Sequence, residues 1–271
     1  MPEGDTIHKS AARLHPALAG HRVERFEAPR LVGPRPAPGT LITDVEAVGK
    51  YLLVHFGEPG PARTLETHMK MTGSWHLYRH GERWQRSARA MRVRIDADSG
   101  WTAVCFSAPH VKLLSAGART GHGHLGPDLT TASPDLDAAV ARFSTAGDGS
   151  RPIGEALLDQ RICCGVGNVY KSEVLHAERL DPRVPVAEVD VATRRRLVAT
   201  AHRLLRANLS SGARITTTDT PEGLAVYRRA GSPCPRCGTA IERIVQGIHA
   251  RSTYFCSGCQ VSAPGVTSPD S

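Results

Sequence analysis

Four cysteines near the end of the chain restrict its fold more than any other feature of the sequence. They form two Cys-x-x-Cys pairs, Cys234/Cys237 and Cys256/Cys259, with 18 residues between them. A two-residue gap lets a turn direct both sulfurs at one ion, and four thiolates suit tetrahedral Zn2+. The alternative, two disulfides or redox pairs, is disfavoured in a reducing compartment. The pattern predicts one structural zinc ion that holds this short stretch folded.

The segment between the two pairs, ERIVQGIHARSTYFC, alternates as a β-hairpin does, with Gly247 near the turn. Arg251 would then project near the hairpin tip, although a single arginine there can also be ordinary solvated surface. The other cysteines, Cys105, Cys163 and Cys164, lie in strand and turn patterns typical of buried small residues.

Upstream of the finger, the periodicity of the sequence changes twice. Residues 6–19 have apolar side chains at helical spacing and are followed by Gly20, which predicts an amphipathic helix. From residue 23 to 117 the pattern is one of short alternating runs broken by Gly and Pro, which predicts a β-rich domain. Residues 152–230 return to helical spacing.

These patterns predict an α+β multidomain chain. We expect an N-terminal domain over 1–128, a linker over 129–150, a helical domain over 151–230, the finger over 231–261 and a disordered tail over 262–271.

The charge balance favours a polyanionic partner without proving one. The chain has 34 basic and 26 acidic residues, a formal net charge of +8. No run is long and apolar enough for a membrane helix, and the start lacks the apolar core of a signal peptide, so we expect a cytoplasmic protein. Only five of the basic residues are lysine, so each lysine marks a position where a removable proton could be wanted.

The chain begins MPEGDTIH, and removal of the methionine would expose the secondary amine of Pro2. A free α-amine has a pKa near 8, so part of it is unprotonated at neutral pH. Such an amine can attack an electrophilic carbon and give a positively charged iminium, while the adjacent Glu3 could supply a proton to a leaving oxygen. Alone, the motif also fits an ordinary helix start, where proline is well tolerated.

Six motifs together support a catalytic role for this N-terminal segment. They are MPEGDTI, VGKYLLVHF, HMKMTGSW, LGPD, LLDQRICCGVGNVYKSE and the finger ending ARSTYFCSGCQ. In order and spacing the chain resembles the formamidopyrimidine-DNA glycosylase/endonuclease VIII family from its first residues to about residue 260. Glycine after MPE is more similar to the endonuclease VIII branch, particularly its actinobacterial members.

The resemblance implies an N-terminal β-sandwich with a flanking helix, a helix-two-turn-helix domain and a zinc-finger hairpin, with DNA held between the two halves. It implies a monomer that acts in the bacterial nucleoid on damaged double-stranded DNA, and single-stranded or bubble DNA is an open alternative. The implied activity is removal of oxidised bases, followed by strand cutting through β- and δ-elimination. Similarity to the endonuclease VIII branch implies that these bases are pyrimidines. Purine specificity and a catalytically impaired DNA-binding homologue remain alternatives. Zinc is structural, and no catalytic metal is implied.

By position, the resemblance makes Pro2 the nucleophile, Glu3 the acid that assists opening of the sugar ring, and Lys50 the proton donor of β-elimination. It assigns Arg251 to a phosphate and to δ-elimination. Without the family match, Lys50 reads equally well as an ordinary lysine at a strand end.

The same resemblance implies a set of DNA contacts. Asn168 would bind a backbone phosphate beside glycines that let the strand approach, with Lys171 one turn further on. Met71, with Lys70 beside it, would fill the space left by an extruded base. His124 stands where a basic residue is common. Without the family resemblance, Asn168 could be a helix cap, Lys171 could be a solvent-exposed lysine and Met71 could be a core residue.

The chain departs from the family pattern at Thr6, where a glutamate is usual, so the division of acid-base duties and the substrate choice are in doubt. Thr6 could instead cap the first helix. A small N-terminal-proline tautomerase is a further rival for the start of the chain, although such enzymes lack a finger.

Overall fold

The computed structural model describes residues 2–115, 121–145, 147, 149–210 and 212–261, and the expected tail, residues 262–271, lies outside them. The chain divides into two compact units, Met1–Gly123 and His124–Ser271. Each unit has its own hydrophobic core. Within the described ranges, no helix is both long enough and apolar enough to cross a bilayer.

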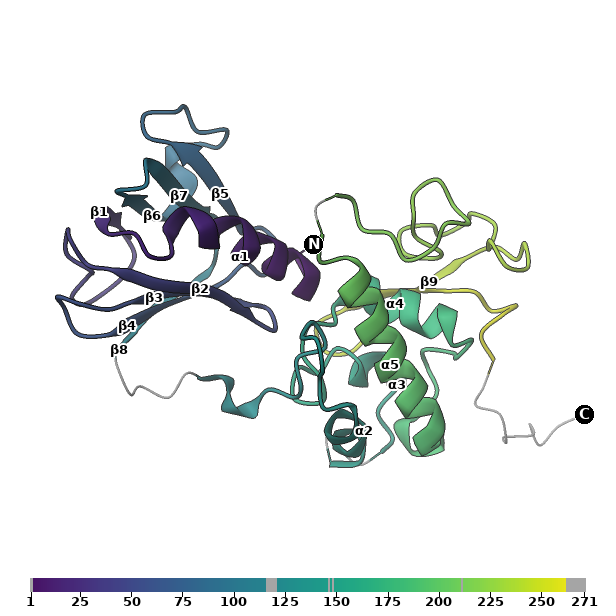
Figure 1. Cartoon of the computed structure of the whole chain (residues 1–271). Helices are drawn as coiled ribbons and strands as arrows, with labels where there is room; N and C mark the ends of the chain where they lie inside the picture. Colours follow the sequence, from purple (N-terminus) through teal and green to yellow (C-terminus); the bar gives the residue numbers. More distant parts are fainter. Residues whose placement is uncertain (1, 116–120, 146, 148, 211, 262–271) are drawn as a thin grey trace, which may run out of the picture. The chain divides into compact units, whose positions relative to one another are not determined.

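Among its described residues, the first unit contains one α-helix and two antiparallel four-stranded sheets (Figure 1). The helix is α1 (Gly4–Leu18). The sheet of order β1-β6-β7-β5 consists of β1 (Val23–Glu27), β5 (Ser74–Arg79), β6 (Met91–Ala97) and β7 (Trp101–Phe106). The sheet of order β2-β3-β4-β8 consists of β2 (Ile42–Val48), β3 (Tyr51–Phe56), β4 (Arg63–His68) and β8 (His110–Ser115).

Both sheets and α1 contribute to one core, in which Ile7, Val54 and Ile95 are almost completely buried. Strands β3, β4 and β7 each contain at least three consecutive buried residues, so parts of both sheets are covered on both faces. This arrangement confirms the predicted β-sandwich with its flanking helix. Pro16 lies inside α1, and Gly20 follows the helix end with φ +81°, a conformation that suits glycine.

Strand β7 is buried on both faces. Cys105 belongs to the core between the sheets, whereas Val104 and Phe106 face the other way into a smaller cluster with Tyr78 and Trp84. Trp84 lies in the connection from β5 to β6, which carries the short helix η1 (Ala88–Ala90). This connection therefore covers part of the outer face of the sheet.

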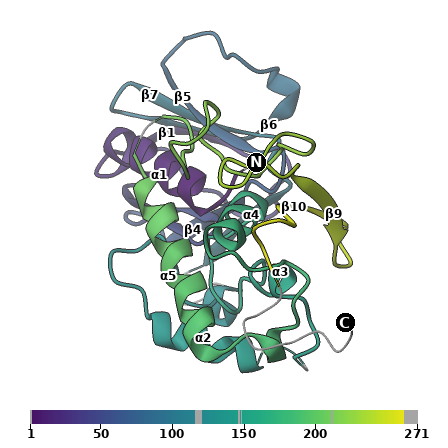
Figure 2. The same cartoon turned by 90° about the vertical axis from the view of Figure 1, so that its right-hand side faces the viewer.

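The second unit is mainly helical and ends in a hairpin. Its elements are α2 (Leu136–Thr145), α3 (Ile153–Ala156), α4 (Asn168–Ala177), η3 (Val186–Glu188), α5 (Val191–Ala207), β9 (Glu242–Gln246) and β10 (Arg251–Phe255), and η2 (Gly121–His124) spans the boundary between the units. Asp190 caps α5 by accepting the N–H of Thr193 at 2.6 Å. Helices α4 and α5 pack against each other (Figure 2).

Residues 129–150, expected to be a linker, contain α2. Its residues Ala139, Val140 and Phe143 are buried in the core of the second unit. Asp135 accepts the N–H of Ala138 at 2.8 Å and so caps the start of this helix. The segment is therefore part of the folded unit, because its one apolar face packs on the neighbouring helices.

Candidate functional site: a metal centre, a hairpin and the ends of two helices

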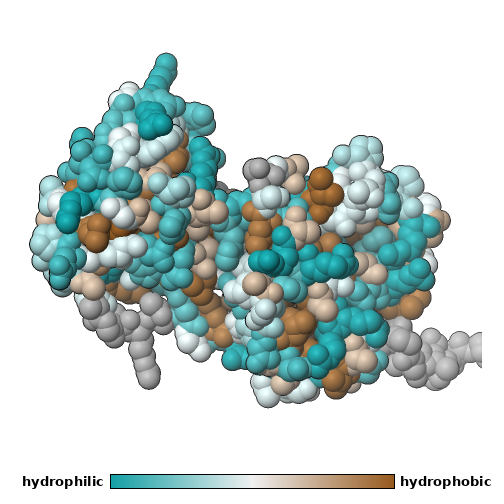
Figure 3. Space-filling model, viewed as in Figure 1, coloured by the Kyte–Doolittle hydropathy of each residue, from teal (hydrophilic) through white to brown (hydrophobic). Residues whose placement is uncertain are grey.

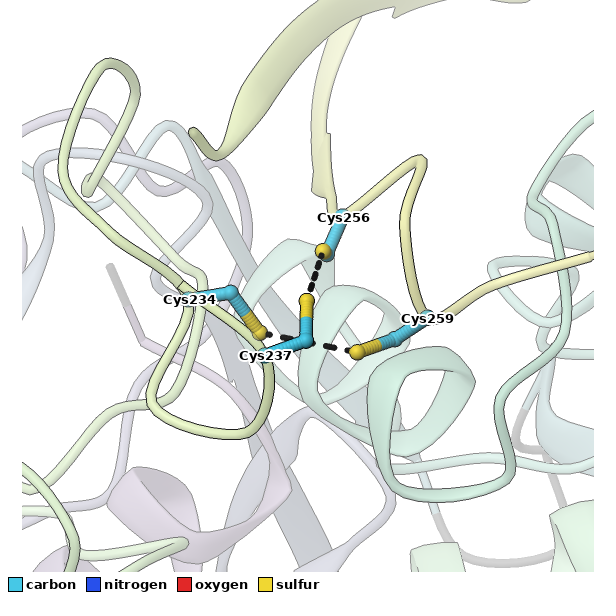
Figure 4. A group of neighbouring side chains, drawn as sticks. All are labelled: Cys234, Cys237, Cys256 and Cys259. Atoms are coloured by element: carbon cyan, nitrogen blue, oxygen red, sulfur yellow. Dashed lines mark hydrogen bonds between the residues drawn. The ribbon is translucent and has the colours of Figure 1, made fainter. Parts of the chain in front are cut away.

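The four finger cysteines converge on one point (Figure 4). The Sγ atoms of Cys234 and Cys259 lie 3.8 Å apart, those of Cys237 and Cys256 lie 3.5 Å apart, and all four fall within 4.8 Å of one another. Thiolates at about 2.3 Å from a tetrahedral zinc ion are about 3.8 Å apart, whereas a disulfide would join them at about 2.05 Å. The donor set and spacing fit one zinc ion and confirm the predicted ligands.

The finger packs in a small apolar cluster that joins its Ile241 to Val226 in the segment before it. Hydrogen bonds with Thr239 and then Cys259 lower the pKa of the Cys237 thiol to about 6, whereas burial raises the pKa of the Cys256 and Cys259 thiols. Burial also raises the pKa of Cys105 to about 12, which keeps this thiol protonated. Cys105, Cys163 and Cys164 are all buried, as predicted.

Arg251 is the first residue of β10, directly after the hairpin turn. It pairs with Gln246 at the end of β9, and Gly247 begins the turn with φ +69°. The predicted hairpin is therefore confirmed, and it places the half-buried Arg251 beside its tip.

Asn168 is the first residue of α4, and Gly167 occupies the cap position, so Asn168 is not the helix cap. Its Oδ1 accepts a hydrogen bond from Nζ of Lys171 at 3.2 Å. A lysine can only donate, so this contact fixes the amide with its oxygen toward Lys171 and leaves the Nδ2 donor for another acceptor. Donors at a helix N-terminus are well placed to bind an anion.

Lys171 itself is completely buried, and this corrects the expectation that it contacts DNA. Its ammonium also donates to Thr253 Oγ1 at 2.6 Å and to the carbonyl of Ser252 at 3.2 Å. All three acceptors are groups of the same unit. Lys171 is therefore an internal support that joins the start of α4 to β10.

The contacts continue from Lys171 across the hairpin. Thr253 Oγ1 donates to Gln246 Oε1 at 2.6 Å, and Gln246 Nε2 donates to the carbonyl of Pro182 at 3.0 Å. Asn168 and the hairpin that carries Arg251 are thus held in one hydrogen-bonded network.

Glu173, two residues beyond Lys171, is buried and organises the approach to the finger. Its carboxylate accepts the N–H groups of Ala225, Val226 and Tyr227 at 2.8, 3.0 and 2.8 Å. It also accepts the hydroxyl of Thr216. One side chain of α4 thereby fixes the backbone that leads into the first cysteine pair.

In the first unit, Glu3 is the N-cap residue of α1 and is fully buried, and Pro2 before it is half-buried. Thr6 lies within the first turn, so it does not cap the helix, and its hydroxyl donates to Asp5 Oδ1 at 3.3 Å. Asp5 is itself buried. The start of α1 therefore holds two buried carboxyl groups beside Pro2.

Lys50 lies in the two-residue turn between β2 and β3, where Val48 pairs with Tyr51. Gly49 has φ +58°, as the first residue of such a tight hairpin turn requires. The turn holds Lys50 in a fixed place at the end of the sheet.

Lys70 and Met71 lie in the turn after β4, at the same end of the sheet because Tyr51 pairs with His68. Nδ1 of His68 accepts the N–H of Lys70 at 3.0 Å, and Lys70 has φ +48°. Met71 is 52% exposed, whereas Met69 is buried, so Met71 is not a core residue. Burial, and then the charges of Lys70 and Lys50, lower the pKa of His68 to about 4 and keep the ring neutral.

His124 is exposed at the end of η2. Three residues outside the predicted set help to build these sites, namely Glu173, Thr253 and His68. Each occurs inside a quoted motif, but its partner is a backbone or side-chain group whose position depends on the fold.

Comparisons with known proteins cover nearly the whole chain. Residues 1–109 match the formamidopyrimidine-DNA glycosylase N-terminal domain, residues 125–220 its H2TH domain, and residues 231–261 a zinc finger found in FPG and IleRS. The chain is 41% identical to a probable endonuclease 8 2 of Streptomyces coelicolor, over 96% of this chain and 94% of the relative. It is 35% identical to a DNA-(apurinic or apyrimidinic site) lyase Nei2 of Mycolicibacterium smegmatis, over 97% of this chain and 100% of the relative.

Among solved structures, the fold is similar to that of Lactococcus lactis Fpg in complex with DNA containing an abasic site. The TM-score is 0.79 at 21% identity, and the match covers 96% of this chain and 99% of that one.

Proposed function

The chain belongs to the formamidopyrimidine-DNA glycosylase/endonuclease VIII family, and from this premise we propose that it is a bifunctional DNA glycosylase and abasic-site lyase. The observation that carries the proposal is Pro2 beside the fully buried Glu3 at the start of α1. A secondary amine next to a carboxyl group supplies both the nucleophile and the acid that the reaction needs.

In the proposed mechanism, the nitrogen of Pro2 bonds to C1′ of the damaged nucleotide as the glycosidic bond breaks, and the base leaves with the bonding electrons and takes up the proton that the nitrogen loses. Glu3 delivers a proton to the sugar ring oxygen, and the ring opens to an iminium. The positive charge of the iminium acidifies the hydrogen at C2′, so loss of that proton expels the 3′ phosphate by β-elimination. A second elimination expels the 5′ phosphate, and water then releases the sugar remnant and restores the amine.

Two side chains serve the eliminations in this proposal. Lys50 is the proton donor in the first, because the tight Gly49-Lys50 turn presents a titratable amine at the end of the sheet. Arg251 neutralises the phosphate expelled in the second, and its place beside the hairpin tip supports this role.

We assign the proposed DNA contacts to side chains that are exposed or that can donate a hydrogen bond to phosphate. Asn168 uses Nδ2 and the adjoining helix start to bind a backbone phosphate. The exposed Met71, with Lys70, fills the space vacated by the extruded base. His124 adds a contact that strengthens when its ring is protonated.

We propose oxidised pyrimidines in double-stranded DNA as the preferred substrates, since the relatives from Streptomyces coelicolor and Mycolicibacterium smegmatis bear endonuclease 8 and Nei2 names. The protein would act as a monomer in the nucleoid. Zinc would be needed for the finger and would take no part in the chemistry.

Borohydride trapping tests the proposal. The zinc-loaded protein is mixed with duplexes carrying thymine glycol, dihydrouracil, 8-oxoguanine, formamidopyrimidine or an abasic site, and adducts and strand ends are analysed. We expect a covalent adduct with abasic DNA that Pro2→Gly sharply reduces while the far-ultraviolet circular dichroism stays unchanged. Full strand cutting by Pro2→Gly, or by protein whose Met1 is retained by mass spectrometry, would overturn the mechanism, and activity on purine lesions alone would overturn the substrate class.

A further inference from the structure

The connection between β5 and β6 is an ordered loop that has no role in the proposed reaction. In Figure 1 it is the blue loop that extends from the β1-β6-β7-β5 sheet. Trp84 anchors it, stacking on Tyr78 with ring centroids 6.5 Å apart and meeting Phe106 edge-on at 5.6 Å. The hydroxyl of Tyr78 also accepts the N–H of Gln85 at 3.1 Å. An aromatic anchor and a hydrogen bond thus hold the loop in one conformation.

The anchored loop presents three exposed arginines, Arg83, Arg86 and Arg89. Within the part of the chain that the structure describes, none of them forms an ion pair with a carboxylate. The one acidic residue of the loop, Glu82, accepts the backbone N–H of Arg79 at 2.8 Å. Like charges repel, so this concentration of guanidinium groups has a cost that binding an anion would relieve.

The positive surface continues onto α1. Burial lowers the pKa of His76 in β5, and the charges of Arg86 and then Arg13 lower it further, so both side chains add to the positive potential at this ring. Arg13 is exposed and lies ten residues beyond Glu3 on α1. At the helical rise this is about 15 Å from the start of the helix, about the length of four to five base pairs of DNA.

We infer that Arg83, Arg86 and Arg89, together with Arg13, bind the phosphate backbone of the DNA duplex at a distance from the damaged nucleotide. The inference rests on the proposed function, because it extends the DNA contact of the same unit beyond the reacting base. The arginine surface would bind DNA of any base sequence, since guanidinium contacts with phosphates carry no base information.

The composition of the loop favours a nucleic-acid backbone over an acidic protein. Protein interfaces are centred on aromatic or aliphatic anchors that reach into the partner. Here the one large aromatic residue of the loop, Trp84, points into the cluster with Tyr78 and Phe106. None of the large exposed hydrophobic side chains within the described residues lies between 79 and 92, and the face of this unit that Figure 3 shows is mostly hydrophilic.

The test compares the zinc-loaded wild-type protein with Arg83→Gln/Arg86→Gln/Arg89→Gln, and with the matched Arg83→Lys/Arg86→Lys/Arg89→Lys variant that keeps the charge. The probes are duplexes with one tetrahydrofuran abasic analogue, one of about 30 base pairs and one with about four on either side of the lesion, which ends about 14 Å from the lesion, short of the distance worked out for Arg13. Dissociation constants are measured over a range of salt concentrations.

On the long duplex, the glutamine variant should bind about fivefold more weakly at 0.15 M salt for each arginine that contacts a phosphate, and the slope of log K against log salt should fall by about 0.9 per contact. The lysine variant should keep the slope, and all three proteins should bind the short duplex equally.

An unchanged affinity and slope for the glutamine variant on the long duplex would overturn the inference and leave an acidic protein as the partner to seek. An equal loss on both duplexes would also overturn it, since the arginines would then act at the lesion. Borohydride trapping of the wild-type protein tests the proposed function independently of this binding experiment.

Discussion

Replacing Lys171 by methionine tests the network that joins α4 to the hairpin. The substitution keeps the length and apolar stem of the side chain and removes the ammonium with its bonds to Asn168, Ser252 and Thr253. Three charge-assisted hydrogen bonds contribute about 5–9 kcal/mol in total, and burying the ammonium costs several kcal/mol of lost hydration. We therefore expect a net loss of about 2 kcal/mol in the free energy of unfolding.

The assay is chemical and thermal unfolding of the zinc-loaded protein. A loss of this size lowers the Tm by about 4–8 °C for a unit of this length. Lys112→Met is the matched control, because Lys112 is exposed on β8 and its loss should change stability by no more than about 0.5 kcal/mol. A double-mutant cycle with Thr253→Val should show coupling of about 1 kcal/mol, as expected for residues in contact.

The same variant should separate binding from chemistry. Without Lys171 the amide of Asn168 loses the partner that orients it, so DNA should bind about fivefold to tenfold more weakly, equivalent to about 1 kcal/mol. The single-turnover rate at saturating enzyme should not change, because Pro2 and Glu3 belong to the other unit. Wild-type stability together with wild-type affinity would refute the assignment of Lys171 as an internal support.

Three further predictions concern the metal, the turn after β4 and its histidine. Removing zinc with a chelator should unfold residues 231–261 and leave the sandwich core intact, so calorimetry should show a separate transition that returns on adding zinc. Met71→Ala should slow excision from paired duplexes more than from bubble DNA, measured by single-turnover nicking, and equal effects on both would exclude a wedge. The folded-state pKa of His68, about 4, lies below its unfolded value of about 6.5, so its contribution to stability is complete above pH 6.5 and is lost as the pH falls toward 4. Guanidinium unfolding at a series of pH values should show a flatter acid limb for His68→Gln, whose side-chain oxygen can still accept the N–H of Lys70.

The parts of the site that could be predicted are those encoded by local spacing. Two Cys-x-x-Cys pairs specify a tetrahedral sulfur site because each pair closes one turn, and Gly247 marks the hairpin between them. Likewise, α1 was predictable because a single helix period runs through its buried residues.

The parts that could not be predicted depend on contacts between residues far apart in the sequence. Lys171 looked like a solvent-exposed lysine because Ser252 and Thr253, which bury and bind it, lie some 80 residues later. The helix α2 was hidden within a turn-rich stretch, and its apolar face became visible only where it packs on α5. The shape of the loop around Trp84 depends on Tyr78 and Phe106 from two different strands.

The hydrogen bonds from three successive backbone amides to Glu173 affect how natural sequence variants of this protein should be interpreted. A missense change at this carboxylate would release the segment that leads into the zinc finger without altering any group proposed to touch the lesion. A genetic screen that scores only repair would place such an allele beside true active-site alleles. Metal content and protease sensitivity, measured on the purified variant, would tell the two kinds apart.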